Sequence, residues 1–81
     1  MSIRIVHFAQ MRELCGCSDE ILDYSSTMSI RTIWDSMILA HPKLRSLSFV
    51  PLPVVNRRYE SWDRPVPDGA EVSFFPPLGG G

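Results

Sequence analysis

One amphipathic helix constrains the fold of this sequence more than any other feature. Its apolar positions are Ile30, Ile33, Trp34, Met37 and Ile38. This spacing follows the helical period of about 3.6 residues and produces one wide apolar face. Ser29 is suited to cap its first turn, and Pro42 ends it by disfavouring helical geometry at His41. Because such a face must be buried against another layer, we expect this helix to lie across a sheet.

Apolar runs on both sides of this helix predict the strands of that sheet. Residues 2–9 are apolar on both faces, as expected of an inner strand. Residues 20–24 and 53–56 read as two further strands. In residues 70–75 apolar and polar side chains alternate, with Val72 and Phe74 on one face and Ser73 and Phe75 on the other. Strands before and after one long helix predict an α+β fold, with a sheet packed on the helix.

Shorter segments connect these elements. Residues 10–15 read as a short helix that stops at Gly16, where a left-handed residue is needed. Residues 56–58 and 65–69 read as turns, the second because proline presets φ and glycine accepts a positive φ. The segment 43–52 fits either a loop or a helical turn.

Length and charge exclude several classes of protein. A chain of 81 residues forms one domain, which buries roughly 60% of its unfolded surface and leaves little room for an enclosed active site. A net charge of −1 argues against a dedicated binder of nucleic acid or anionic membrane. No apolar run approaches the roughly 20 residues that span a bilayer, and no signal peptide is evident. We therefore expect a cytoplasmic protein.

The C-terminal residues predict a change in character. Pro76 and Pro77 cannot donate ladder hydrogen bonds, so the last strand must stop before them. The glycines after Leu78 offer no side chain to offset the entropy of ordering. We expect a domain over residues 1–75 and a flexible, extended Gly-Gly tail over residues 76–81. Either the tail is simply disordered, or it presents an unhindered terminal carboxylate for activation as an acyl adenylate and attack by a nucleophile.

Several stretches carry a resemblance to a known family. They are residues 8–14 (FAQMREL) with Gly16, residues 65–72 (PVPDGAEV), residues 74–77 (FFPP) and the final Gly80-Gly81. Together with the length and the order of elements, they cover the whole chain. The sequence resembles the small subunits of molybdopterin synthase, the ubiquitin-like sulfur carriers of molybdenum cofactor biosynthesis. The resemblance implies a β-grasp fold, in which a mixed sheet packs on one long helix.

The resemblance also implies a function for the tail. An E1-like activating enzyme would consume ATP to adenylate Gly81, which then becomes a thiocarboxylate. Gly79 and Gly80 would insert with it into the large subunit of the synthase, where the sulfur passes to cyclic pyranopterin monophosphate and builds the dithiolene. The sulfur would come indirectly from a cysteine desulfurase or rhodanese type of donor. In this reading the chain is a non-catalytic carrier with no bound cofactor, in a heterotetramer of two small and two large subunits.

The same resemblance implies a docking surface. Phe75, Pro76 and Pro77, with Tyr59 at a matching interface position, would contact both the activating enzyme and the large subunit, which therefore bind alternately. Arg12 is a further candidate contact through its place in the family motif.

The cysteines and histidines predict little chemistry by themselves. Cys15 and Cys17 are too few for a disulfide scaffold, and we read them as free bystander thiols. With His7 and His41 they make four possible zinc ligands. However, C-x-C is not the usual zinc spacing and the histidines are isolated in the sequence, so we predict no metal site.

Three alternatives to the molybdopterin branch stay open. The chain is also compatible with a sibling sulfur carrier for thiamine or tRNA thiolation. A ubiquitin-like modifier joined to lysines would carry the same diglycine. An inert β-grasp interaction module would need no terminal glycines at all. The FFPP stretch and the length favour the molybdopterin branch.

Overall fold

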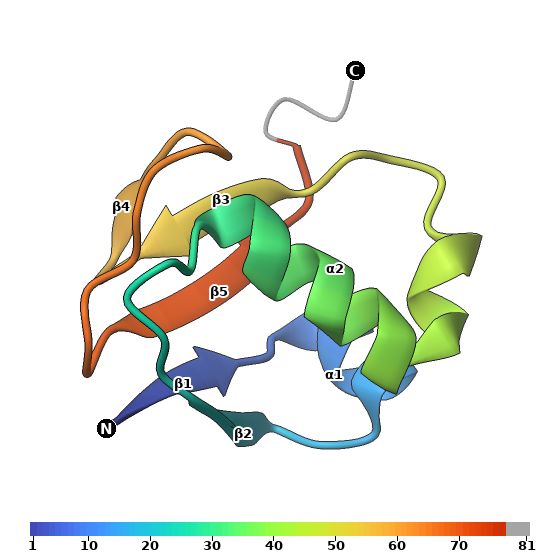
Figure 1. The fold of residues 1–81 in the computed structure, drawn as a ribbon. Coiled ribbons are helices and arrows are strands. Elements are labelled where there is room, and N and C mark those ends of the chain that lie inside the picture. Colours follow the sequence, from blue (N-terminus) through green and yellow to red (C-terminus); the bar gives the residue numbers. More distant parts are fainter. Residues whose placement is uncertain (78–81) are drawn as a thin grey trace.

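The chain folds into a five-stranded mixed sheet with one long helix packed across it (Figure 1). The computed structural model describes residues 1–77. Its elements are β1 (Ser2–Val6), α1 (Ala9–Cys15), β2 (Asp19–Asp23), α2 (Ile30–Ala40), the 3-10 helix η1 (Pro42–Ser46), β3 (Leu52–Val55), β4 (Arg58–Tyr59) and β5 (Glu71–Phe75). The predicted α+β architecture, a β-grasp sheet packed on one long helix, is confirmed.

The strand order β2-β1-β5-β3-β4 places the first and last strands, β1 and β5, side by side inside the sheet. β1 and β5 run parallel, with Arg4 opposite Glu71, and the other neighbours are antiparallel. β1 is therefore an inner strand, as its apolar residues on both faces predict. β5 is also inner, because β3 pairs with its other side from Leu52 opposite Phe75 to Val55 opposite Val72.

The core lies between α2 and one face of the sheet. Helix residues Ile30, Ile33 and Met37 are fully buried. They pack in one cluster with the buried apolar residues of β1 and β5, which are Ile3, Ile5, Val72 and Phe74. Ser29 caps the helix as predicted, because its hydroxyl accepts from the Thr32 N–H at 3.3 Å in a reciprocal capping box.

Two tryptophans extend this core. Trp34 packs on Phe74, with ring centroids 4.7 Å apart, and Trp62 stacks on Phe74 at 5.9 Å. The two tryptophans also contact each other edge to face at 6.1 Å, so the three rings form one cluster. Trp62 is one of the partly buried residues that pack against the core.

Several boundaries differ from the predicted ones. β1 ends at Val6 instead of Ala9, because α1 already begins at Ala9. The His7 N–H still donates to the carbonyl of Ser18 at 2.8 Å, in the register of the β1–β2 pair. Asn56 and Arg57 form the tight β3–β4 turn with positive φ, as expected. The prediction that Arg58 also belongs to the turn is wrong, since Arg58 pairs with Val55 and begins β4.

The ambiguous stretch after α2 forms the 3-10 helix η1, which buries Leu44. Pro76 and Pro77 follow β5 as exposed, non-strand residues, whereas the predictions for Gly79, Gly80 and Gly81 lie outside the described residues. Within residues 1–77, neither α-helix combines the length and the apolar character that crossing a bilayer requires. The cytoplasmic location stays a prediction.

Candidate functional site

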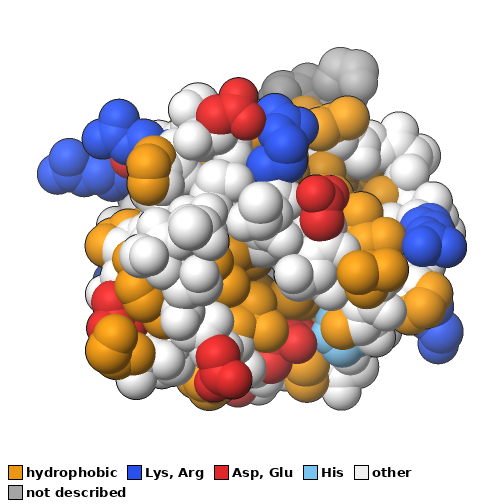
Figure 2. Space-filling view, in the orientation of Figure 1, with side chains coloured by type: hydrophobic (Ala, Val, Ile, Leu, Met, Phe, Trp, Pro, Cys, Tyr) orange, Lys and Arg blue, Asp and Glu red, His pale blue; other side chains and the backbone are white. Residues whose placement is uncertain are grey.

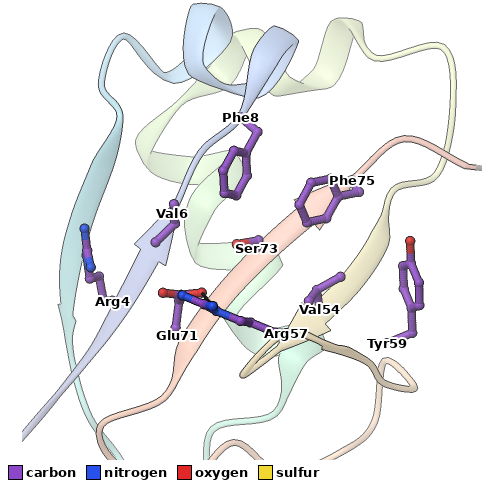
Figure 3. Close-up of a pocket in the computed structure, with 9 residues that line it drawn as sticks. All are labelled: Arg4, Val6, Phe8, Val54, Arg57, Tyr59, Glu71, Ser73 and Phe75. Atoms are coloured by element: carbon purple, nitrogen blue, oxygen red, sulfur yellow. Dashed lines mark ion pairs between the residues drawn. The ribbon is translucent and has the colours of Figure 1, made fainter.

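A shallow hollow of about 480 Å³ lies on the face of the sheet that α2 leaves uncovered (Figure 3). Its residues alternate along the strands with the core residues, so they point away from the helix. They are Arg4, Val6, Phe8, Val54, Arg57, Tyr59, Glu71, Ser73 and Phe75. The hollow therefore adjoins the point where the chain leaves β5.

Two stacked phenylalanines form the apolar end of the hollow. The rings of Phe8 and Phe75 are 5.1 Å apart between centroids and inclined by 20°. The parallel register that sets Arg4 opposite Glu71, continued along both strands, brings Phe8 opposite Phe75. Phe8 is 41% exposed and Phe75 is half-buried, so an apolar surface remains free for contact.

Tyr59 faces this aromatic pair from the far side of the hollow (Figure 3). It lies on the short edge strand β4, opposite Val54 of β3. The ring is 56% exposed, which is high for an aromatic side chain. Aromatic residues are enriched at protein–protein interfaces, so Tyr59 and the Phe8–Phe75 pair have the composition of a docking surface.

Charged side chains line the opposite end of the hollow. Arg57 lies 3.9 Å from Glu71, and Arg4 is paired with Asp19 at 3.0 Å. Both pairs are largely exposed and contribute little to folding. The hollow thus has an apolar end and a charged end, and charged groups at the border of an interface serve orientation more than affinity.

The structure brings together only part of the predicted site. Phe75 and Tyr59 line the hollow, and Pro76 and Pro77 follow it directly as exposed residues. Arg12 does not line it, because it lies further along α1 and is exposed.

Phe8 was not predicted as a contact residue, although it opens the FAQMREL stretch. The signal was available in the alternation of β1 and β5, which sets Val6 and Ser73 on the same uncovered face. Neither strand could be placed beside the other from the sequence alone.

A second group of polar side chains lies away from the hollow, where β1 and both helices end. Glu20 accepts hydrogen bonds from His7 and His41, and the thiol of Cys17 lies beside it. The two histidines are isolated in the sequence, but the fold brings both to one carboxylate. Glu20 was not among the predicted site residues. Within residues 1–77, both sets of His, Cys, Asp and Glu side chains that are close enough to hold a metal ion include it.

The environment shifts the acidities in this group. Burial and the nearby charge of Glu20 raise the pKa of Cys15 to about 12. Burial and the hydrogen bond to Glu20 raise the pKa of Cys17 as well. Burial alone would raise the pKa of Glu20, but the hydrogen bonds with His7 and His41 outweigh it and leave that pKa below its usual value. Both thiols are thus protonated at neutral pH, and neither is an activated nucleophile.

Comparison with known proteins assigns the chain to a family. The model of the ThiS family matches residues 5–81. A curated relative from Escherichia coli named molybdopterin synthase sulfur carrier subunit is 34% identical and covers 98% of this chain and 99% of its own. A relative of the same name from Chlamydomonas reinhardtii is 30% identical over the whole of both chains. The solved structure of a putative molybdopterin converting factor subunit 1 from Pyrococcus furiosus is 27% identical, covers 96% of this chain and 99% of its own, and superposes with a TM-score of 0.86.

Two less similar structures show the fold alone. SAMP1 from Haloferax volcanii is 24% identical over the whole of both chains, with a TM-score of 0.83. A complex of subunits 1 and 2 of the molybdopterin-converting factor from Helicobacter pylori contains a chain that is 17% identical over the whole of both chains, with a TM-score of 0.66. The β-grasp fold is therefore shared by proteins with different names, and it does not by itself select one function.

Proposed function

Because this chain belongs to the ThiS family, we propose that it is the sulfur carrier subunit of a molybdopterin synthase. The observation that carries the proposal is the end-to-end match to curated proteins of that name, at 34% and 30% identity. The geometry supports it, because an apolar docking surface adjoins the exit of the chain from β5. A carrier needs such a surface and a free end, and it needs no catalytic side chains of its own.

The reacting group in this proposal is the carboxylate of Gly81. Inside an E1-like activating enzyme a carboxylate oxygen attacks the α-phosphorus of ATP, pyrophosphate leaves, and an acyl adenylate forms. The terminal sulfur of a persulfide on a desulfurase or rhodanese type of donor then attacks the acyl carbon and displaces AMP, which gives an acyl disulfide. A thiol attacks the donor's sulfur, breaks the S–S bond and leaves with that sulfur as a disulfide. The product is a thiocarboxylate, and ATP serves as a substrate of the activating enzyme.

The partner in which the sulfur is transferred is the large subunit of the synthase. We place its docking surface over Phe8, Phe75 and Tyr59, from which the prolines direct residues 78–81 toward the partner's active site. There the thiocarboxylate would give its sulfur to cyclic pyranopterin monophosphate. Since the activating enzyme uses the same surface, the two partners would bind alternately, and two copies of each subunit would form the heterotetramer.

Intact-protein mass spectrometry tests the carrier step directly. After incubation with the activating enzyme, ATP and a sulfur donor, we expect a gain of about 16 Da, the difference between a sulfur and an oxygen atom. The matched control is the same chain without Gly80 and Gly81, which should fold normally and gain nothing. An unchanged mass of the full chain, with an activating enzyme that loads another carrier, would reject the proposal.

Further assays separate the alternatives. The loaded chain should convert cyclic pyranopterin monophosphate to molybdopterin when the large subunit is added. Loading without this conversion would favour a sibling carrier for thiamine or tRNA thiolation. Covalent adducts in a cell lysate that resist reducing agents would indicate a protein modifier. Unimpaired function after deletion of both glycines would indicate an inert interaction module.

A further inference from the structure

Four segments of the chain meet at the side-chain cluster around Glu20. His7 follows β1, Glu20 lies in β2, Cys17 lies in the loop after α1, and His41 caps the end of α2. The pairing of Val6 with Asp19 brings the end of β1 beside the start of β2. Histidine atoms reach the surface at the edge of the face shown in Figure 2, next to acidic and apolar side chains.

Three donor groups converge on one oxygen atom of this cluster. The Nε2 atoms of His7 and His41 lie 2.7 and 2.9 Å from Oε2 of Glu20, and the Sγ of Cys17 lies 3.5 Å from it. Ligand atoms of His7, Cys17 and Glu20 all lie within 4.8 Å of one another, and those of Cys15, Glu20 and His41 do the same. Imidazole nitrogens and a thiol that point to one position are the arrangement in which a metal ion is bound.

We propose that this cluster is a Zn²⁺ site with His7, Cys17, Glu20 and His41 as its four ligands. Two imidazoles, a thiolate and a carboxylate match the donors and the coordination number of zinc, and the two anionic ligands neutralise the ion. Zinc binds nitrogen at about 2.0–2.1 Å and thiolate sulfur at about 2.3 Å. Because Glu20 Oε2 occupies the point of convergence, its carboxylate moves aside to become the fourth ligand while the other groups close in.

Binding redistributes two kinds of proton. The Cys17 thiol loses its proton to solvent as the Zn–S bond forms, and the charge of the ion offsets the thiol's resistance to ionisation. Each imidazole moves its proton from Nε2 to Nδ1, so that the Nε2 lone pair faces the metal. The reaction therefore releases one proton per zinc ion from the thiol and needs no oxidant or reductant.

The site has the character of a structural zinc site. Four protein ligands complete the coordination and leave no open position for a substrate. His7 is 1% exposed, and the side chains of His41 and Glu20 are 20% and 21% exposed, so an ion is shielded but has an entry path. An ion here ties the ends of β1 and α2 to β2 in a domain whose core is small for its surface. None of the four ligands lines the hollow, so the inference does not depend on the proposed function.

Metal titration tests the proposal on the reduced, chelator-treated full chain. We expect one equivalent of Zn²⁺ to bind, with a dissociation constant below about 1 μM against a competing chromophoric chelator. Co²⁺ in its place should show a thiolate charge-transfer band and the intense visible bands of tetrahedral coordination. Weaker binding than this, or cobalt spectra without a thiolate band, overturns the proposal.

Matched variants test the ligand set. Cys17→Ser and Glu20→Gln should each weaken zinc binding by at least about tenfold. Asp23→Asn makes the same charge change at the exposed far end of β2 and should leave it unchanged. Circular dichroism of each variant in chelator shows that the fold is retained. If Cys15→Ser abolishes binding and Cys17→Ser does not, the assigned thiol ligand is wrong, and wild-type cobalt spectra test the site even where a variant fails to fold.

Discussion

Adjacent phenylalanines on β5 allow docking and folding to be separated by single substitutions. Phe75 lies on the uncovered face and is half-buried, whereas Phe74 points into the core and is 2% exposed. Phe75→Ala should weaken binding of the molybdopterin synthase large subunit by about 2 kcal/mol, or about 30-fold in Kd, because a partly exposed aromatic at the centre of an interface is a typical hot spot.

The cost of Phe75→Ala to folding should be smaller. The variant removes the stack with Phe8, whose centroid is 5.1 Å away, and such pairs contribute about 0.5–1.5 kcal/mol beyond their buried area. In contrast, Phe74→Leu disturbs the contacts with Trp34 and Trp62 and should lower the free energy of unfolding by about 1–2 kcal/mol. It should leave the Kd within a factor of about two of the wild-type value, since its side chain faces α2.

Calorimetric titration with the large subunit and urea denaturation of each variant provide the two measurements. Ile21→Ala is the matched surface control, because Ile21 is 61% exposed on the edge strand β2 and does not line the hollow. The reasoning is refuted if Phe75→Ala binds as tightly as the wild type. It is equally refuted if Ile21→Ala or Phe74→Leu weakens binding as much as Phe75→Ala does.

Three further predictions concern folding. Ser29→Ala removes the α2 capping box and should lower the free energy of unfolding by about 1 kcal/mol in urea denaturation, whereas an unchanged midpoint would show that the cap is redundant. Gly69→Ala adds a Cβ that meets no atom within 4 Å, but it puts a side chain on a residue with φ +80°. We expect thermal melting to show a loss of about 1 kcal/mol in the free energy of unfolding, and an unchanged melting temperature would contradict this. The pKa of Cys15 is raised from 9.0 to about 12 in the folded chain, so the thiol ionises first in the unfolded chain. In the presence of a chelator, its contribution to the free energy of unfolding is therefore complete below pH 9 and is lost between pH 9 and pH 12. Denaturation at pH 10 should show a loss of roughly 1 kcal/mol that Cys15→Ala lacks.

Local signals predicted most elements of this fold. The spacing of Ile30, Ile33 and Met37 identified α2 and its buried face, and Ser29 and Pro42 marked its ends. Gly16 was predicted to stop α1 and does so with φ 74°. These predictions succeed because helix periodicity, capping and left-handed glycine depend on neighbours in the sequence.

Long-range pairing could not be predicted in the same way. The hollow depends on the parallel pairing of β1 with β5, which are the first and last strands along the chain. This pairing brings Phe8 beside Phe75. The meeting of His7, His41 and Cys17 at Glu20 depends on the ends of four segments, and the C-x-C spacing gives no sign of it. Both clusters therefore depend on tertiary contacts, whereas the exposed Tyr59 and the half-buried Phe75 were predicted through the family resemblance.

The central position of β5 has a mechanical consequence. A force applied at Phe75 along the axis of β5 acts on a strand that hydrogen bonds to β1 and β3 hold on both sides. Since those bonds run across the direction of pull, the force shears two ladders at once instead of opening one bond after another. The domain can thus sustain more tension along β5 than a fold in which the same strand is hydrogen-bonded along a single border.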